Sequence, residues 1–365
     1  MPAELSHTDA VGGQTAAGRL HLPGCELPEL EAWLTGLGEA RYRAAQILKW
    51  VYEKHAAGFE EMSDVSKALR AALNQRAAIY ASSVMRDSVS ADGTRKLLLG
   101  WPDGATVETV WIPAADRDTA CLSVQVGCPV GCRFCASGLG GLERNLSAGE
   151  IVEQALRISG LVASAGEGRG RLSNIVVMGM GEPLANYGNL VKALRIINAP
   201  WGLGIGARKI TVSTVGLPGP IRRLARQGLQ INLALSLHAP DDALRQELVP
   251  WARGISIAEL VDACTDYFKT TGREITLEYV LLDGLNMQAR HATELARIAR
   301  RLRANVNLLR YNPVPGLPFR RPTAEAAHEF QRRLRACGVN AHMRTSRGAD
   351  VNAACGQLRH ATRDV

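Results

Sequence analysis

The sequence predicts an α/β fold built from consecutive strand–helix–strand units, and three observations lead to this prediction. From residue 120 onward, short apolar strand candidates alternate with helical segments, a rhythm typical of a parallel sheet or barrel. The chain has 365 residues, enough for one large domain and a smaller one. Its hydrophobic content is 46%, but it has no run of about 18 apolar residues, so we expect no membrane span.

The N-terminal part precedes this rhythm. Residues 1–22 are polar and rich in Gly and Ala, and we expect a disordered tail. They lack the basic start and apolar core of a signal peptide. The segment 27–78 has a helical pattern, and Ser63 is the expected N-cap of its last helix. One predicted helix places five apolar side chains on one face: Ala44, Ile47, Leu48, Val51 and Tyr52.

Short strands are predicted between residues 82 and 113. Asp-Gly pairs at 92–93 and 103–104 are typical hairpin turns between apolar runs. The last run, 106–112, alternates, so Glu108 shares a face with Val110 and Ile112. A carboxylate that shares a face with apolar neighbours is notable, and such a glutamate usually lies at an exposed sheet edge.

Residues 116–346 carry the repeating units. Strands are predicted at 120–126, 173–179, 208–214, 231–238, 274–282, 305–311 and 340–345. Helices are predicted near 147–160, 188–198, 217–227, 256–270, 287–303 and 323–336. In such folds the chemistry gathers in the loops at the carboxyl ends of the strands.

Three cysteines directly follow the first predicted strand: Cys128, Cys132 and Cys135. A four-iron cluster normally takes four thiolates, so three of them leave one iron open to a substrate. A structural zinc site would need a fourth Cys or His close by, and the nearest downstream histidine is His238. The spacing therefore favours an open-site iron–sulfur cluster over zinc.

Polar or glycine-rich segments follow the other strands. Gly181 and Glu182 lie in the segment 179–183, after the second strand. Glycines allow a close backbone approach to a ligand, and a carboxylate accepts from an ammonium group. Any one polar residue at a strand end is most simply a turn residue or a helix cap. Because several of them follow successive strands of the predicted sheet, together they favour one pocket. The remaining strand ends add Ser213, Ser236, Leu237, His238 and Asn312.

The other cysteines have a default interpretation as buried small side chains. Cys25, Cys264 and Cys337 fit it. Cys121 lies seven residues before the first cysteine of the loop, at the predicted start of the first barrel strand. Cys355 lies in a glycine-bearing stretch beyond the last strand. From the residues alone, each of these two is also structural by default.

Taken together, these motifs resemble the RlmN/Cfr family of radical S-adenosylmethionine (SAM) RNA methyltransferases. The resemblance runs from about residue 27 to 358 and implies a partial (βα)6 barrel with a small N-terminal helical domain and short β hairpins. It rests on motifs in family order: Glu108, Cys121, 125–128, Cys132, Cys135, 144–146, 179–183, 236–240, 311–313 and 354–358. The implied division is a tail at 1–22, an accessory RNA-binding domain at 23–115, the barrel at 116–346 and a C-terminal segment at 347–365.

The resemblance also implies roles. Cys128, Cys132 and Cys135 hold one [4Fe-4S] cluster, and two SAM molecules are used per turnover. Cys355 becomes S-methylcysteine, Glu108 accepts a proton, and Cys121 resolves a covalent RNA adduct through a transient disulfide with Cys355. The implied SAM contacts are Gly181, Glu182, Ser213, Ser236, Leu237, His238 and Asn312.

The implied substrate is an adenine of 23S rRNA, and of tRNA, methylated at C2. The alternative within the family is C8 of the rRNA adenine. The formal net charge of +8 suits an RNA partner, although an arginine-rich composition weakens that argument. The further expectations are an electron donor such as flavodoxin, a monomer, and a cytoplasmic location without membrane contact.

Two other classes stay open. A radical SAM enzyme of another reaction type would not need Glu108, Cys121 and Cys355 together. A non-catalytic RNA-binding module with a structural cluster would need a fourth thiolate and no SAM contacts.

Overall fold

The computed structural model describes residues 15, 18–166 and 170–359. Most of the expected tail, 1–22, lies outside the described residues. Its last part is ordered, because β1 (Leu20–His21) pairs with β2 (Ala77–Ala78) and Leu22 is fully buried. The ordered chain therefore begins earlier than the sequence indicated.

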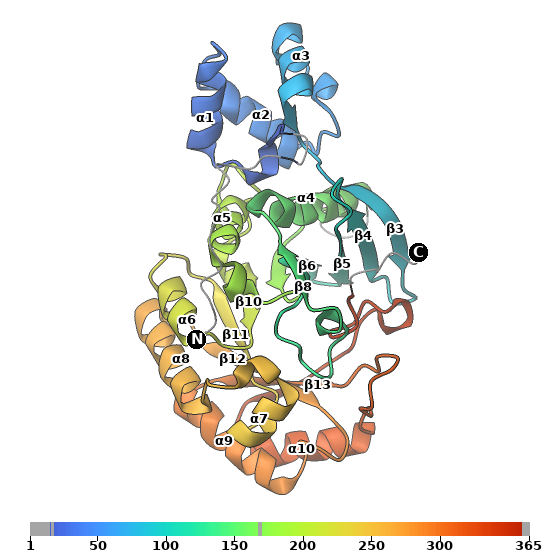
Figure 1. Cartoon of the computed structure of the whole chain (residues 1–365), viewed down its shortest axis with the longest axis vertical. Coiled ribbons are helices and arrows are strands. Elements are labelled where there is room, and N and C mark those ends of the chain that lie inside the picture. The colour runs from blue at the N-terminus through green and yellow to red at the C-terminus, as the bar shows by residue number, and fades with distance from the viewer. Residues whose placement is uncertain (1–14, 16–17, 167–169, 360–365) are drawn as a thin grey trace.

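A small helical domain stands at one end of the molecule (Figure 1). It contains α1 (Leu27–Gly36), α2 (Arg43–Tyr52) and α3 (Lys67–Arg76). The predicted apolar face of α2 is buried. The predicted cap was wrong: Ser66, not Ser63, receives the hydrogen bond from the backbone N–H of Leu69, at 3.2 Å. The helix starts at Lys67, and only a side chain directly before it reaches that orphan donor.

The centre of the molecule is a ten-stranded sheet in the order β14-β13-β12-β11-β10-β9-β6-β5-β4-β3. The strands from β6 and β9 to β14 are all parallel. They form the expected partial barrel, with β14 as a further strand at its edge. Their bounds are β6 (Arg117–Cys121), β9 (Asn174–Val177), β10 (Ile210–Thr214), β11 (Asn232–Ser236), β12 (Ile275–Leu281), β13 (Asn305–Arg310) and β14 (Ala341–Arg344).

The first predicted barrel strand, 120–126, is divided in the structure. β6 ends at Cys121, and β7 (Gln125–Gly127) pairs instead with β8 (Leu142–Asn145). The break has a local cause, because the Gln154 side chain bonds both the N–H and the C=O of Ser123 at 2.9 Å. Cys121 therefore lies at the carboxyl end of its strand, not at the start as expected.

Helices cover the outer face of the parallel strands (Figure 1). The six predicted helices are present, and the short α7 (Asp242–Leu248) adds a seventh to the described part of the barrel. Asp241 caps α7 by accepting from the backbone N–H of Leu244. The predicted helices are α4 (Ala148–Ser164), α5 (Tyr187–Asn198), α6 (Pro218–Ala225), α8 (Ile257–Thr271), α9 (Ala289–Leu302) and α10 (Ala324–Ala336). Single 3-10 turns occur at Leu22–Gly24, Phe59–Glu61, Ala136–Gly138, Pro183–Asn186, Ala207–Lys209, Pro250–Ala252 and Ala349–Val351.

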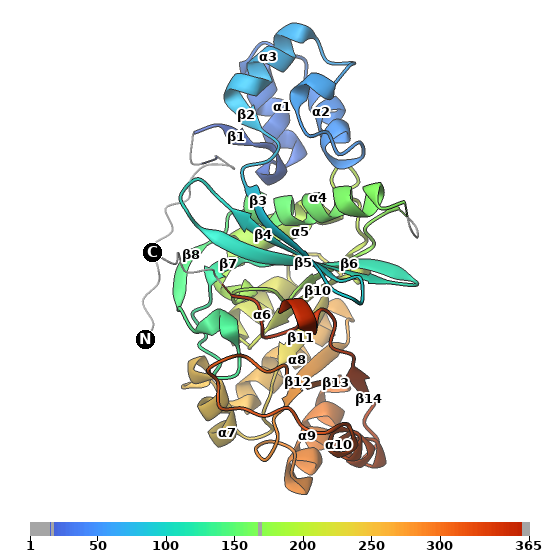
Figure 2. The same ribbon diagram turned by 90° about the vertical axis from the view of Figure 1, so that its right-hand side faces the viewer.

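The predicted hairpins are not a separate layer. β3 (Ser83–Val89), β4 (Arg95–Gly100) and β5 (Thr106–Ala114) continue the barrel sheet as antiparallel strands (Figure 2). The predicted division at 115/116 thus falls inside one sheet. Glu108 does not lie at an exposed edge, where such a glutamate is usually found. Its strand lies between β4 and β6, and Glu108 is 8% exposed.

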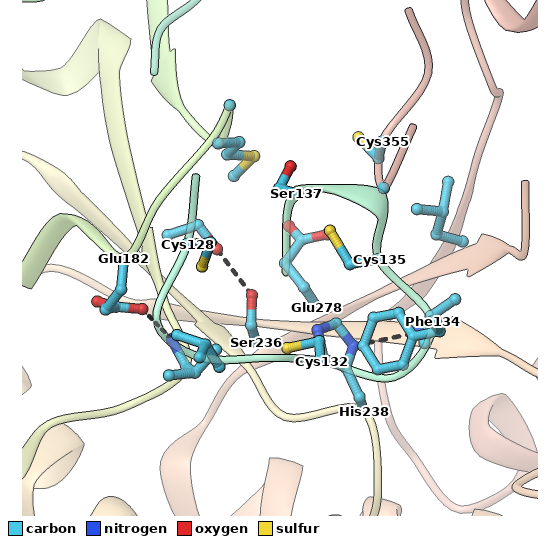
Figure 3. Close-up of a pocket in the computed structure, with 18 of the residues that line it drawn as sticks. Cys128, Cys132, Phe134, Cys135, Ser137, Glu182, Ser236, His238, Glu278 and Cys355 are labelled. Carbon is cyan, nitrogen blue, oxygen red and sulfur yellow. Dashed lines mark hydrogen bonds between the residues drawn. The ribbon is translucent and has the colours of Figure 1, made fainter. Parts of the chain in front are cut away.

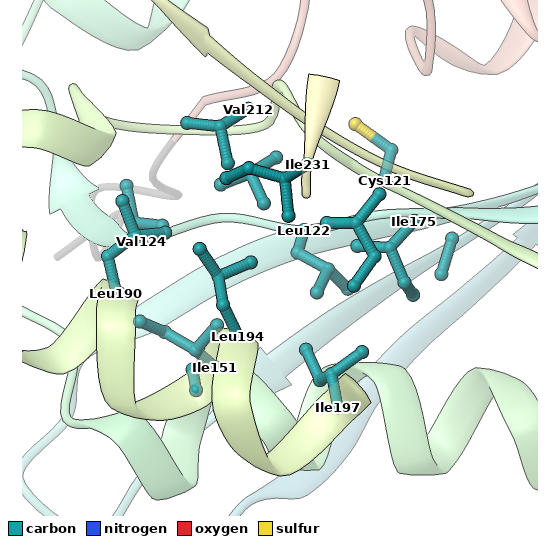
Figure 4. Close-up of a cluster of buried hydrophobic side chains, with 14 of the residues drawn as sticks. Cys121, Leu122, Val124, Ile151, Ile175, Leu190, Leu194, Ile197, Val212 and Ile231 are labelled. Carbon is teal, nitrogen blue, oxygen red and sulfur yellow. The ribbon is translucent and has the colours of Figure 1, made fainter. Parts of the chain in front are cut away.

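The core beneath the barrel strands fixes their relative positions. Figure 4 shows α4 and α5 packing Ile151, Leu190 and Leu194 against strand residues that include Ile175 and Val212. All five side chains are fully buried, and burial of each contributes roughly 1.5–3 kcal/mol. Among the described residues, no helix is both long enough and apolar enough to cross a bilayer.

Candidate functional site

A cavity opens at the carboxyl ends of the parallel strands. Ligand sites of α/β proteins commonly lie at this end of the strands. Figure 3 shows the cysteine loop and Cys355 at this cavity. Of the residues predicted for the site, ten line it: Cys128, Cys132, Cys135, Gly181, Glu182, Ser213, Ser236, His238, Asn312 and Cys355.

The cysteine loop is shaped by backbone hydrogen bonds. The N–H of Cys128 donates to Gly141 O at 2.8 Å, and the N–H of Cys135 donates to Cys132 O at 3.1 Å. The N–H of Arg133 donates to Leu248 O at the end of α7. None of the three cysteines is in a disulfide, and burial raises the pKa of the Cys128 thiol to about 12.

This donor set fits an open-site cluster. In the described part of the chain, no three His, Cys, Asp or Glu side chains converge on a single metal ion. A cubic cluster does not require such convergence, because each thiolate binds a different iron. Three partly buried sulfurs on one cavity wall, beside open volume, therefore match a four-iron cluster better than a zinc ion.

The glycine-rich segment 179–183 lies close to the cysteine loop. Gly181 has φ +101°, and a Cβ there would stand 2.6 Å from the Gln125 side chain. Glu182 is buried, and its carboxylate accepts from Thr214 Oγ1 at 2.7 Å and from the N–H of Val215 at 2.9 Å. Burial raises its pKa, while those hydrogen bonds oppose the rise. The carboxylate thus braces β9 against β10 at the cavity wall.

The next strand ends supply hydroxyl and imidazole groups. Ser213 and Ser236 share a hydrogen bond of 2.9 Å between their hydroxyls. His238 has φ +60°, and its Nδ1 accepts from the N–H of Val280 at 3.2 Å. Burial, with the charge of Arg245, lowers the pKa of His238 to about 3, so the ring is neutral. Leu237 differs from its neighbours, because its side chain is fully buried in the core and does not line the cavity.

The C-terminal segment brings Cys355 to the cavity. Asn312 Nδ2 donates to Cys355 O at 3.1 Å, and the N–H of Ala136 donates to Gly356 O at 2.8 Å. Ser137 Oγ donates to Leu358 O at 2.6 Å. These contacts join a segment more than 200 residues away in sequence to the cysteine loop, and they leave Cys355 exposed.

Cys121 and Glu108 lie beside the cavity without lining it. In the antiparallel pair β5–β6, Cys121 is opposite Val110, so Glu108, two residues along, projects on the same face. Glu108 Oε1 pairs with Lys96 Nζ at 2.7 Å, and Oε2 accepts from the N–H of Arg359 at 3.0 Å. The predicted proton acceptor is thus linked to the segment that carries Cys355.

Cys121 itself is buried at the end of β6. Burial, followed by the charge of Cys355, raises the pKa of its thiol to about 12, and Arg344 opposes this rise. The effect of Cys355 on this pKa indicates that the two cysteines are near each other.

Several residues of the site had no signal in the sequence. Arg344 and Glu278 line the cavity, as does Ser137. Both charged residues occur on predicted strands, where a single arginine or glutamate is most simply a solvated side chain. Arg344 is the last residue of β14, a position shared with the predicted ligands, whereas Glu278 lies in the middle of β12.

Comparisons with known proteins agree with this geometry. Residues 20–79 match the ribosomal RNA large subunit methyltransferase N-terminal domain, and residues 122–296 match the radical SAM superfamily. A probable dual-specificity RNA methyltransferase RlmN from Gloeobacter violaceus is 47% identical over 93% of this chain and 94% of its own length. The dual-specificity RNA methyltransferase RlmN of Syntrophus aciditrophicus is 43% identical over 93% of this chain and 96% of its own.

A solved structure is also similar over nearly the whole chain. A radical SAM methyltransferase from Sphaerobacter thermophilus superposes with a TM-score of 0.90 at 47% identity, covering 93% of this chain and 99% of that one. Fold, helical domain and barrel are therefore shared with one group of proteins.

Proposed function

This chain belongs to the RlmN family of dual-specificity radical SAM RNA methyltransferases, and on that premise we propose that it methylates C2 of an adenine in 23S rRNA and in tRNA. The observation that carries the proposal is that Cys355 and the three cysteines of the loop line one cavity, with Gly356 bonded to Ala136 of the loop and Cys355 bonded to Asn312. Cys121 and Glu108 stand on the neighbouring sheet face. An RNA methyltransferase that used polar methyl transfer alone would need none of these three residues.

The residues that would hold the cofactors line one cavity. Cys128, Cys132 and Cys135 would bind a [4Fe-4S] cluster with one open iron. Bound together, the cluster and SAM supply a radical able to remove a hydrogen atom from a methyl group. The polar contacts for SAM would come from the remaining cavity residues: Gly181, Glu182, Ser213, Ser236, His238 and Asn312. Leu237 would contribute through its backbone.

Cys355 is suited to carry the methyl group because it is exposed and aimed at the same cavity. Its sulfur would accept a methyl group, and once a hydrogen atom has been removed from that group, the methylene carbon on Cys355 would bond to the adenine carbon. Such a route is required because an adenine C2–H is neither acidic nor nucleophilic. The result is a covalent bond between protein and RNA, which must then be released.

Release uses the two residues next to the cavity. Glu108 is the proposed acceptor of the proton from the attacked carbon, since general bases act on protons within reach. Cys121 is the proposed attacking thiol, and it leaves a disulfide with Cys355 that a dithiol later reduces. The enzyme would take electrons from a donor such as flavodoxin and act as a monomer.

The test is to trap the covalent intermediate. In reconstituted enzyme given SAM, reductant and a 23S rRNA transcript, Cys121→Ala should accumulate a protein–RNA adduct on a denaturing gel. Cys355→Ala should form none, since it has no sulfur to carry the methyl group. Adduct in both variants, or in neither, would contradict the assigned roles.

A further inference from the structure

One arginine lies near both cysteines of the proposed release step: Arg344 lines the cavity with Cys355 and contacts Met178, two residues beyond the partner of Cys121 on β9. Arg344 is the last residue of β14, and its side chain lines the same cavity as Cys355. Its Nη1 lies 3.1 Å from Glu278 Oε2 and 3.8 Å from Met178 Sδ. Because Met178 directly follows β9, the guanidinium reaches from the edge of the barrel toward the end of β6.

A row of side chains on adjacent strands fixes this arginine. Glu278 on β12 accepts from Asn307 Nδ2 on β13 at 2.9 Å through its other carboxylate oxygen. In the sheet register Glu278 is opposite Asn307. The carboxylate is thus held on one side by an amide and on the other by Arg344, and the guanidinium has a defined orientation.

The charge of Arg344 acts on both thiols. Cys355 is the strongest influence that raises the pKa of Arg344, and Glu278 and Cys121 add to it. Arg344 in turn opposes the burial that raises the pKa of Cys121 to about 12. The other charged groups on that face, Glu108 and Lys96, are paired with each other at 2.7 Å. Arg344 is paired with Glu278 as well, but it is the cation whose charge opposes the rise in the pKa of Cys121.

A nearby cation matters in the release step because the buried thiol of Cys121 must ionise before it attacks. The thiolate, not the thiol, attacks in sulfur exchange. Burial disfavours the ionised form of Cys121, so the thiolate forms there at a cost in free energy. A fixed positive charge beside the developing thiolate lowers that cost.

We propose that Arg344 is a positioning residue that stabilises the Cys121 thiolate as it attacks the sulfur of Cys355. The inference rests on the proposed function. In the step, an S–S bond forms and the bond between Cys355 sulfur and the methylene carbon breaks. The electron pair of the broken bond goes to carbon, which takes a proton and becomes the product methyl group. The two sulfurs are oxidised to a disulfide, the carbon is reduced, and a dithiol reductant restores the thiols.

The experiment measures adduct lifetime in three reconstituted variants given SAM, reductant and a 23S rRNA transcript. Arg344→Gln keeps a side chain of similar polarity but removes the charge. Arg335→Gln is the matched control, because Arg335 supports the same strand by donating to Ala341 O at 2.9 Å, away from the cavity. Cys121→Ala provides the fully trapped reference.

Arg344→Gln should accumulate the protein–RNA adduct, resolving it about tenfold more slowly for each unit by which the pKa of Cys121 rises. Raising the pH from 7 to about 9 should speed its resolution, because more Cys121 is then ionised. Arg335→Gln should resolve the adduct at the wild-type rate. A simple loss of structure would give less adduct, not more, so the readout separates the two roles.

Wild-type resolution by Arg344→Gln would overturn the inference, as would a variant that forms no adduct because Cys355 is never methylated. Should Arg344→Gln not fold, Arg344→Lys carries the test. Its shorter reach should slow resolution at pH 7 and leave the rate dependent on pH, and an unchanged rate would again contradict the proposal. If Cys121→Ala itself traps nothing, the proposed function fails independently of Arg344.

Discussion

Cys355 is held by its backbone, not by its side chain. Its carbonyl accepts from Asn312, and the next carbonyl, of Gly356, accepts from the N–H of Ala136. The sulfur is left free toward the cavity. Replacement of Cys355 by alanine therefore removes the reactive atom and leaves the contacts that build the loop, which makes it a clean probe of chemistry.

The shape of the cysteine loop depends more on Gly127 than on Gly131. Gly127 has φ +75°, and a Cβ there would stand 2.0 Å from Gly141 O, the atom that accepts from Cys128 N–H. Gly131 has φ +66°, but a Cβ there meets nothing within 4 Å. A side chain at Gly131 costs only the left-handed strain, about 1–2 kcal/mol, whereas one at Gly127 must displace backbone.

We therefore predict that Gly127→Ala loses the cluster while Gly131→Ala keeps it. After anaerobic reconstitution, wild type and Gly131→Ala should hold one four-iron cluster whose EPR spectrum changes on addition of SAM. Gly127→Ala should show little iron. Equal iron loading in both variants would mean that the 127–141 contact does not shape the site.

At this scale the sequence predicted the reactive residues better than their environment. The cysteine spacing and the polar strand ends led to ten residues that line one cavity. The burial of Glu108 could not be predicted, because alternation along a strand does not tell which strands lie on either side. The role of Arg344 could not be predicted from the sequence, because it depends on Glu278 and Cys121, which lie on other strands.

Among the elements, the β3–β4 hairpin binds the C-terminal segment, which its turn motif does not indicate. Ser90 Oγ donates to Asp350 at 2.6 Å, and Asp92 accepts from the N–H of Gly348 at 3.0 Å. Lys96 Nζ donates to Asn352 O. The Asp-Gly pair predicted the turn correctly. It did not indicate that the turn binds the C-terminal segment, about 260 residues further along the chain. The hairpin thereby seats the segment that carries Cys355.

Helix α4 joins the helical domain to the sheet through Glu153, which is fully buried. Its carboxylate lies 3.0 Å from His21 Nε2 and 3.0 Å from Arg157 Nε, and accepts from Ser82 Oγ at 2.6 Å. Burial alone would raise its pKa, but these partners hold the pKa at about 2, below the ordinary 4.5. This depression corresponds to about 3 kcal/mol of stability at neutral pH.

We predict that Glu153→Gln lowers the free energy of unfolding by about 3 kcal/mol at pH 7. A carboxylate with a depressed folded pKa stabilises above its unfolded pKa, and this stability is lost as the pH falls from about 4.5 toward 2. The difference from wild type should therefore shrink on acidification. Urea unfolding of cluster-free protein at pH 7 and pH 3 measures it.

The exposed pair of Glu60 with Arg70 is the control. Glu60 is 73% exposed and 3.8 Å from its partner, and such pairs contribute little. Glu60→Gln should change the unfolding free energy by less than about 1 kcal/mol at either pH. A difference between wild type and Glu153→Gln that does not vary with pH would contradict the role given to this carboxylate.

For the whole molecule, local periodicity predicted the α/β class and the order of elements, because each helix and strand has its own apolar pattern. It did not predict that the antiparallel hairpins extend the barrel sheet. Sheet continuity depends on pairing between β5 and β6, whose register is not visible in either strand alone. That continuity brings Glu108 to Cys121 and unites the site.

The product base tests the proposed function most directly. Nucleosides from rRNA and tRNA of a strain lacking this gene should be compared by mass spectrometry with those of the strain complemented with wild type or Cys355→Ala. Wild type should restore 2-methyladenosine in both RNAs, and Cys355→Ala should not. Restoration of 8-methyladenosine instead, or of 2-methyladenosine by the Cys355→Ala variant, would contradict the proposal.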